Sequence, residues 1–352
     1  MKRMEEIIEN TLIDLWTRQF PRSKCQINQP HESDAELFEI EGNPYHYIAV
    51  TIDTVAEEIT EGLYQDPYTM GWVTVMANLS DLAAVGADPL GLVISVSVES
   101  SRSKSFSEGI AQGMADACKT SGTFILGGDT NITQTISLTG CAIGLVPRNE
   151  KISRCGCKKG DIVFISSGVG IGNALGLMRL ANLSSDLFPE NFYRPIARLK
   201  EGRFIRKYAS CCMDTSDGLL TTLDQLMRIN NVGFTIDCNW EKILIPSVLE
   251  FCDRTSTPYW LMSAGQHGEF ELVFTVKITE SEVFLAEAQA QGFHPIRIGT
   301  IQQTPCITLV LTSGDKVEID MIPLRNLLQT VNGDLKRYVQ EFRRWGKKWG
   351  LE

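Results

Sequence analysis

The chain has 352 residues, of which 43% are hydrophobic and 22% charged, and its formal net charge is −10. This length predicts about two domains. The excess of acidic residues argues against a nucleic-acid partner, because such proteins gain affinity by neutralising phosphates with lysine and arginine. No run of about 18 apolar residues is present, so no membrane span is predicted, and the N-terminus lacks the apolar core of a secretory signal. We therefore expect a cytoplasmic protein.

Hydrophobic periodicity predicts strands and helices that mix along the whole chain. Strands are expected at residues 45–52, 91–98, 123–126, 136–146, 161–166, 234–238 and 271–276. Helices are expected at residues 4–15, 67–85, 105–121, 172–183 and from 219 onwards. A polar, basic stretch at 147–160 indicates the join between two domains, residues 1–150 and 151–352. The mixture predicts two α+β or α/β domains rather than an all-α or all-β fold.

Five aspartates stand in separate polar segments between these elements, each beside a small or hydroxylated residue. They are Asp34, Asp53, Asp81, Asp129 and Asp217. Mg²⁺ is a hard cation that prefers oxygen ligands and usually shares its shell with waters and substrate phosphates. The set of five therefore predicts a site for magnesium and nucleotide phosphates.

Two of these segments also have a simpler interpretation. Asn78 and Asp81 are three residues apart in a predicted helix, so their side chains share one face, but the spacing also fits an ordinary exposed aspartate. Gly127 and Gly128 before Asp129 would let the backbone approach a ligand closely, but they also fit a simple tight turn after a strand. The sequence alone leaves both pairs of alternatives open.

The segment Asp-Thr-Ser-Asp-Gly-Leu, residues 214–219, precedes a predicted amphipathic helix. Ser216 is its expected N-cap, and a helix N-terminus favours phosphate. Asp214 and Asp217 place two carboxylates at the same end, and a bridging cation would reconcile them with a bound phosphate. The alternative is that both acids only complement the helix dipole.

Two further motifs are less informative. Gly168 to Gly172 reads G-x-G-x-G, which is not the dinucleotide-binding G-x-G-x-x-G, and no P-loop sequence is present. The basic C-terminal tail, with Trp345 and Trp349, predicts a solvated helix whose aromatic residues dock on the body. A membrane-surface or nucleic-acid patch is the alternative interpretation of this tail.

Taken in order, these segments resemble the thiamine-monophosphate kinase branch of the aminoimidazole-ribonucleotide-synthetase-like (PurM-like) superfamily. The resemblance spans about residues 30 to 300 and rests on Thr51–Thr54, Asn78–Pro89, Gly127–Thr130, Asp214–Leu219 and Glu269–Thr275. It implies an N-terminal domain whose strands form a β-barrel across a homodimer, flanked by helices, and a C-terminal α+β sandwich.

The resemblance further implies that ATP and Mg²⁺ lie in a cleft and that the ATP γ-phosphate passes to a small, phosphorylated acceptor. The implied metal ligands are Asp34, Asp53, Asp81, Asp129 and Asp217. Two of them, Asp129 and Asp217, are also the expected catalytic residues. The residues expected beside the phosphates are Thr54, Gly127, Gly128, Thr130 and Ser216.

Several segments depart from the family pattern. Glu32-Ser33-Asp34 stands where the family has a glycine and two aspartates. The His-Phe pair that the family has after Asp53 is missing, and the chain reads Glu57-Glu58-Ile59-Thr60 there. These changes predict a paralogue with a different acceptor. The alternatives are ATP-dependent activation of an amide or carbonyl oxygen, as in other members of the superfamily, and a nucleotide-binding protein without catalysis.

Overall fold

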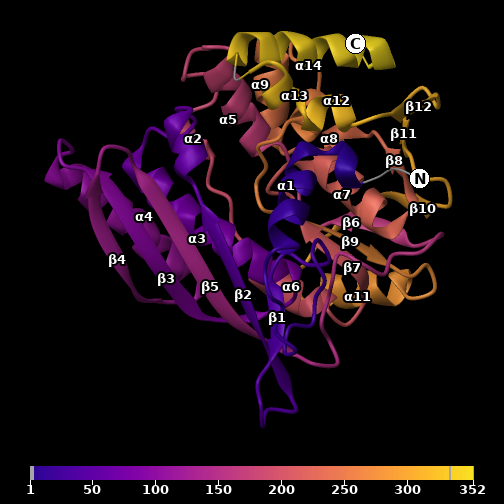
Figure 1. Ribbon diagram of the computed structural model, residues 1–352. Coiled ribbons are helices and arrows are strands. Elements are labelled where there is room, and N and C mark those ends of the chain that lie inside the picture. The colour runs from indigo at the N-terminus through magenta and orange to yellow at the C-terminus, as the bar shows by residue number, and fades with distance from the viewer. Residues whose placement is uncertain (1–3, 333, 352) are drawn as a thin grey trace.

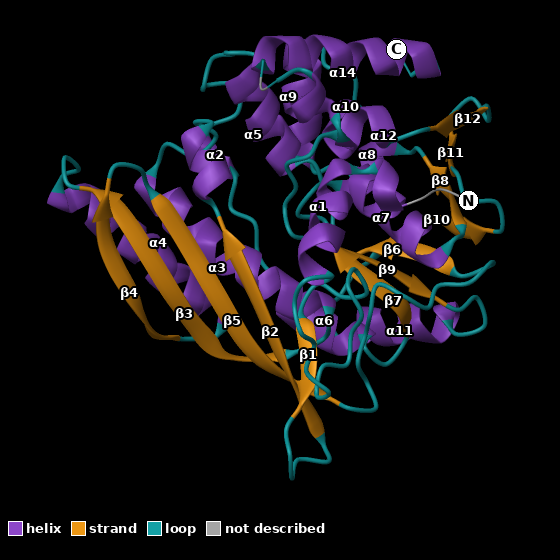
Figure 2. Ribbon diagram, in the orientation of Figure 1, coloured by secondary structure: helices purple, strands orange, loops and turns teal. Residues whose placement is uncertain are grey.

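The computed structural model describes residues 4–332 and 334–351, which form two β-sheets with helices packed around them (Figure 1). Figure 2 shows the two sheets as separate groups of strands, the first at the left and the second at the right. Among the described helices, none is long and apolar enough to cross a membrane. The predicted mixture of strands and helices is confirmed as an α+β fold.

The first sheet has five strands in the order β1-β2-β5-β3-β4. Their bounds are β1 Glu36–Glu39, β2 His46–Thr54, β5 Ser137–Pro147, β3 Asp88–Glu99 and β4 Ile125–Thr133. Neighbours are antiparallel except β3 and β4, which run parallel. Within the described residues this sheet stays open, with β1 and β4 at its edges, so one chain alone does not form the expected barrel.

Two long helices, α3 (Pro67–Ala84) and α4 (Lys104–Ser121), cover one face of the first sheet (Figure 1). Helix α3 begins after Asp66, whose carboxylate accepts hydrogen bonds from two backbone N–H groups of the first turn. It is buried along almost its whole length because it lies between the sheet and α4. Gly71 and Gly113 allow this contact, since a methyl group on either would overlap a backbone carbonyl of the other helix.

The second sheet has seven strands in the order β12-β11-β8-β10-β6-β9-β7. Their bounds are β12 Lys316–Ile319, β11 Ile307–Val310, β8 Gly233–Asp237, β10 Ile296–Gln302, β6 Ile162–Ile165, β9 Leu272–Val276 and β7 Ala209–Asp214. The longer helices in the rest of the chain are α1 Ile8–Thr17, α5 Ile171–Leu180, α6 Leu199–Ile205, α7 Leu219–Asn230, α9 Pro246–Thr255, α11 Ser281–Ala290 and α14 Leu335–Trp349. The short ones are η1 Met4–Glu6, α2 Ala56–Thr60, η2 Glu190–Phe192, α8 Trp240–Ile243, α10 Leu261–Ala264, α12 Ile322–Arg325 and α13 Leu327–Thr330.

The structure confirms the existence and type of the predicted strands and helices, but two local predictions are wrong. The strand predicted at residues 123–126 ends too early, because pairing with β3 continues β4 through residues 127–130 to Thr133, which excludes the alternative of a tight turn there. Ser216 is not the N-cap of α7, which begins after Gly218. Trp349 of the C-terminal helix does dock on the body, since its ring centroid lies 6.0 Å from that of Trp260, and Phe342 of the same helix stacks on Trp260 at 5.9 Å.

Candidate active site

Three carboxylates from distant segments meet where the helix-covered side of the first sheet adjoins the second sheet. Asp34 precedes β1, Asp81 lies on α3, and Asp214 ends β7. Each offers one oxygen atom, and these atoms all lie within 4.8 Å of one another. Long-range packing of α3 against β2 and β7 creates this cluster.

The side chain of Asp34 is only 1% exposed. Its Oδ1 accepts a hydrogen bond from the Arg154 guanidinium at 3.0 Å. Its Oδ2 is buried and has no hydrogen-bond partner among the described residues. Since a buried oxygen without a partner is costly, this atom indicates a missing positively polarised partner.

Asp81 and Asp53 form a second pair beside it. The Thr51 hydroxyl donates a hydrogen bond to Asp81, and the backbone N–H of Asp53 donates to the Asn78 side chain at 3.0 Å. Burial, followed by the charges of neighbouring aspartates, raises the pKa of Asp81 well above its usual range. Burial also raises the pKa of Asp53. Asn78 and Asp81, which were predicted to share one face of a helix, therefore both contribute to the site.

Asp214 and Asp217 flank the turn into α7. Asp214 accepts hydrogen bonds from the hydroxyls of Ser80 at 2.6 Å and Ser216 at 2.9 Å. Burial, followed by the Asp34 charge, raises its pKa to about 7. Burial, followed by the Glu9 charge, raises the pKa of Asp217 to about 6. Both carboxyls thus hold protons more readily than exposed aspartates when no cation is bound.

The chemistry of this donor set fits a hard cation. Asp34, Asp53, Asp81 and Asp214 supply oxygen ligands only, which Mg²⁺ prefers, and Arg154 is the guanidinium that pairs with the cluster. Four carboxylates against one arginine leave a negative excess that burial makes expensive. A divalent cation would remove that excess and would pair the unpartnered oxygen of Asp34.

A cavity of about 370 Å³ lies over this cluster, lined by six carboxylates and two arginines. A second cavity, of about 470 Å³, lies beside it. The two share a boundary of six lining residues: Glu9, Glu58, Asp217, Gln266, His267 and Arg325. The acidic cavity therefore continues into a second space on the same side of the molecule.

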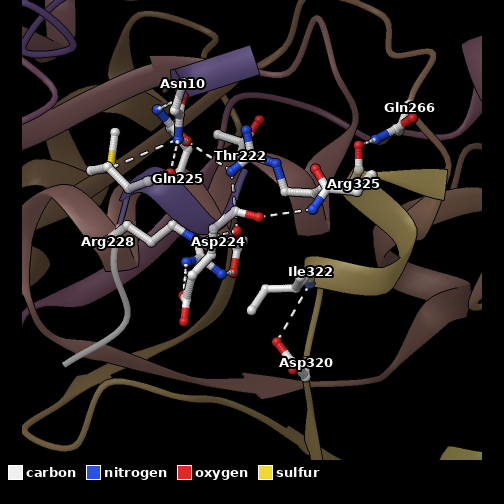
Figure 3. A network of polar contacts seen from close by, with 12 residues as sticks. Asn10, Thr222, Asp224, Gln225, Arg228, Gln266, Asp320, Ile322 and Arg325 are labelled. Atoms are coloured by element: carbon white, nitrogen blue, oxygen red, sulfur yellow. Dashed lines mark hydrogen bonds and ion pairs between the residues drawn. The ribbon is translucent and has the colours of Figure 1, made fainter. Parts of the chain in front are cut away.

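Arg325 reaches this boundary from α12 and is held by a buried network (Figure 3). Its Nη1 donates to Asp224 at 3.0 Å and to Gln225 at 2.7 Å, both on α7. Gln225 also exchanges hydrogen bonds with Asn10 on α1. The network ties the N-terminal helix and α12 to the helix that follows Asp217.

The predicted site residues fall into two groups. Asp53, Asp217, Thr54 and Ser216 line the same acidic cavity as Asp34 and Asp81. Gly127, Gly128, Asp129 and Thr130 are instead exposed on the edge strand β4.

The pairing of residues across the first sheet gives the distance between Asp53 and the β4 motif. Asp53 pairs with Gly140, Gly140 with Ile94, and Ile94 with Gly128. Three strand spacings of about 4.8 Å put the two ends of this row about 14 Å apart. Asp129 is the next residue along β4, so its side chain also points to the opposite face of the sheet from Asp53. Within one chain, Asp129 does not join the cluster.

Sequence reasoning missed two residues of the cluster. Asp214 was visible in the same motif as Asp217, but its place at the end of β7 decides which of the two meets Asp34 and Asp81. Arg154 lies in the polar stretch between the sheets, where nothing in the local sequence marks it as a partner of Asp34.

The sequence of the chain is similar to the sequences of known proteins. Residues 32–146 match the family described as "AIR synthase related protein, N-terminal domain". The chain is 32% identical to the thiamine-monophosphate kinase of Archaeoglobus fulgidus over 244 residues, which are 69% of this chain and 78% of that protein. The chain belongs to the thiamine-monophosphate kinase family. The family resemblance and the expected enzyme class, a kinase, are confirmed.

A further relative is similar to the chain in sequence, and solved structures are similar to it in fold. The thiamine-monophosphate kinase of Methanocaldococcus jannaschii is 27% identical over 282 residues, covering 76% of this chain and 86% of that protein. The structure of tt0281 from Thermus thermophilus has a TM-score of 0.73 at 25% identity and covers 86% of this chain and 95% of that one. The structure of "AaThiL complexed with AMPPCP and TMP" also has a TM-score of 0.73, at 24% identity, covering 91% and 97%.

Proposed function

We propose that this protein is a Mg²⁺-dependent phosphotransferase that moves the γ-phosphate of ATP to a small phosphorylated acceptor. The observation that carries the proposal is the meeting of Asp34, Asp81 and Asp214, whose oxygens lie within 4.8 Å of one another under an acidic cavity. Phosphoryl transfer depends mainly on positioning and charge neutralisation. A buried set of oxygen ligands beside a cavity supports that chemistry.

The residues proposed to hold the metal are Asp34, Asp53, Asp81 and Asp214. Bound Mg²⁺ would supply the positive charge that lets phosphates approach these carboxylates. The Thr51, Ser80 and Ser216 hydroxyls keep the carboxylate oxygens oriented. A phosphate monoester is already ionised at neutral pH, so no side chain is needed to deprotonate the acceptor. Asp217 and Arg325, which line both cavities, would align the acceptor.

ATP is the proposed donor. A fold neighbour is described as bound to AMPPCP and TMP, and the relatives with matching sequence are named thiamine-monophosphate kinases. The acidic cavity over the cluster and the second cavity beside it together give space for a nucleotide and an acceptor. The acceptor proposed for this chain is a phosphorylated metabolite of the size of thiamine monophosphate.

A homodimer with a β-barrel across its interface is the proposed assembly. The face of the first sheet opposite α3 carries exposed apolar side chains, among them Ile52 at 68% and Val93 at 38% exposure. Ile132 on β4 is 76% exposed, and β4 is an edge strand. An apolar face beside an unpaired edge invites pairing with a second copy. Such pairing would also let the partner's Asp129 approach a cluster that it does not reach within its own chain.

A product assay tests the proposed function directly. Purified protein is incubated with ATP, Mg²⁺ and thiamine monophosphate or related phosphate monoesters, and the products are separated by chromatography. ADP and a diphosphate ester in equal amounts support phosphoryl transfer. ADP with inorganic phosphate and a dehydrated product would point to carbonyl activation, and no nucleotide turnover with any acceptor would contradict the proposal.

A further inference from the structure

Arg325 lies at the boundary between the acidic cavity and the second cavity. Six residues line both cavities, and Arg325 is the basic one among them. Three of the other five are acids, namely Glu9, Glu58 and Asp217. A negatively charged group of a ligand at this boundary would be repelled by the ionised acids, so Arg325 is the boundary residue that could attract it.

Only part of the Arg325 guanidinium is engaged by the protein. Its Nη1 donates to Asp224 at 3.0 Å and to Gln225 at 2.7 Å (Figure 3). No hydrogen bond among the described residues engages its Nε or Nη2, and neither atom is among the buried ones that lack a partner. These N–H groups are therefore open to the cavities that Arg325 lines. Guanidinium donors in a fixed fork suit the oxygens of a phosphate group.

Asp224 holds this guanidinium without lining either cavity. It lies on α7, and its side chain is 1% exposed. Its carboxylate is shared between two arginines, because Arg228 on the same helix also donates to it, at 2.7 Å. An arginine side chain loses conformational freedom when it binds a ligand. Since Asp224 and Gln225 already fix Nη1 of Arg325, less freedom remains to be lost when the open donors bind.

The network around Arg325 joins segments from both ends of the chain. Gln225 exchanges hydrogen bonds with Asn10 on α1, at 3.2 Å in each direction. Gln266 donates to the backbone carbonyl of Arg325 at 3.0 Å. Asn10 and Arg325 lie outside residues 30–300, over which the motifs resemble the kinase family. The position of Arg325 therefore depends on contacts that those motifs do not include.

We propose that Arg325 binds a phosphate group of a substrate at the boundary between the two cavities, and that Asp224 is the positioning residue that orients its guanidinium. This inference rests on the proposed function and deepens it, because it names an anion contact that the metal cluster does not supply. Both the nucleotide and the acceptor carry phosphate. Asp224 acts only through Arg325, so substitutions at the two positions should not add.

A double-mutant cycle tests both parts of the proposal. The wild-type protein, Arg325→Gln, Asp224→Asn and the double variant are titrated calorimetrically in Mg²⁺ with ADP and, separately, with thiamine monophosphate. We expect Arg325→Gln to weaken one of these ligands roughly ten-fold or more, as for a hydrogen bond to a charged group. Asp224→Asn should weaken the same ligand about three-fold or more, because Arg325 must then be immobilised on binding. In the Arg325→Gln background, Asp224→Asn should have no further effect.

Arg228→Gln is the matched control, because it removes the other guanidinium paired with Asp224 and lines neither cavity. Its ligand affinities should stay close to those of the wild-type protein. Weaker ADP binding by Arg325→Gln assigns the phosphate to the nucleotide, and weaker thiamine-monophosphate binding assigns it to the acceptor. Wild-type affinity of Arg325→Gln for both ligands, or an equal loss in Arg228→Gln, would overturn the inference. Additive losses in the double variant would overturn the role of Asp224.

Folding and function are checked separately. The melting temperature of each ligand-free variant shows whether it is folded before titration, and a purely structural role of Arg325 would lower that temperature without weakening binding by the folded protein. If Asp224→Asn is too unstable to titrate, Gln225→Leu takes its place in the cycle, because it removes the other acceptor of Nη1. Wild-type protein without nucleotide turnover in the product assay would contradict the proposed function. Normal turnover with unchanged affinities in Arg325→Gln would contradict only this inference.

Discussion

The acidic cleft and the edge strand β4 carry equally distinctive sequence motifs but differ in their surroundings. In the cleft, Asp34, Asp81 and Asp214 come from distant segments and meet within 4.8 Å. On β4, Asp129 and its glycines are exposed at the edge of an open sheet. In the buried cleft, other segments of the same chain provide the groups that contact the motif. On the exposed edge strand, such groups would have to come from a bound molecule.

The difference also shows in how the carboxylates are held. Hydroxyls of Thr51, Ser80 and Ser216 and the guanidinium of Arg154 fix the cleft aspartates. Asp129 accepts a hydrogen bond from Asn131, two residues along the same strand, at 2.6 Å. Long-range contacts therefore orient the first set, and only a local contact orients the second.

The largest expected effect comes from removing a carboxylate of the cleft. We expect Asp214→Asn or Asp81→Asn to lower kcat by about 10²–10³-fold, because charge stabilisation in the transition state is lost. ADP release measures this, with the exposed Asp186→Asn as control. The metal-free variants should remain folded, since each substitution removes a buried charge. Near-normal turnover of both variants would refute the assignment of the cluster.

Mixing two inactive variants tests whether β4 acts across subunits. If Asp129 serves the partner's site, mixed dimers of Asp81→Asn and Asp129→Asn contain one intact site. Half of randomly formed dimers are mixed, so activity should recover to about a quarter of the wild-type rate. No recovery after verified subunit exchange would mean that Asp129 acts within its own chain or not at all.

Replacing Gly140, which lies next to Asn78 in the cleft, tests how far the geometry of the cleft depends on close packing. A methyl group on Gly140 would collide with the side chain of Asn78, which accepts the hydrogen bond from the Asp53 backbone. We expect Gly140→Ala to cost about 1–3 kcal/mol in the free energy of unfolding, as measured by urea denaturation. Gly176→Ala is the matched control, because its methyl group would meet nothing closer than 3.8 Å, and equal effects of the two would contradict this reasoning.

The smallest expected effect concerns pH. Burial raises the pKa of Glu269 from its ordinary value of 4.5 to about 8. The folded state then binds this proton more readily than the unfolded state, so the stabilisation is complete at low pH and is lost as pH rises toward about 8. The melting temperature of metal-free protein should fall by a few degrees between about pH 5 and pH 8. Glu269→Gln should flatten the profile, Asp129→Asn on exposed β4 should not, and an unchanged profile in Glu269→Gln would contradict the pKa shift.

Periodicity predicted much of this fold because burial on one face imposes a repeat on each element. It recovered β2, α3 and β5 from local sequence alone. It ended the strand at residue 126, before the two glycines, whereas parallel pairing with β3 extends β4 to Thr133. The N-cap prediction also failed, because the Ser216 hydroxyl donates a hydrogen bond to Asp214 and does not cap α7.

The candidate site was only partly predictable for a related reason. Asp34, Asp53 and Asp81 were recognisable by their neighbours, and the structure brings them to one cavity. The roles of Asp214 and Arg154 depend on how β7 and the stretch between the two sheets approach α3, which no local pattern encodes.

Calorimetric titration with Mg²⁺ in the absence of nucleotide tests the central claim most directly. The wild-type protein and the Asp186→Asn control should bind Mg²⁺ with the same affinity. Asp214→Asn should bind it at least about ten-fold more weakly, because a charged oxygen ligand has been lost. Equal Mg²⁺ affinity of Asp214→Asn and the wild-type protein would contradict the assignment of Asp34, Asp81 and Asp214 as a metal site.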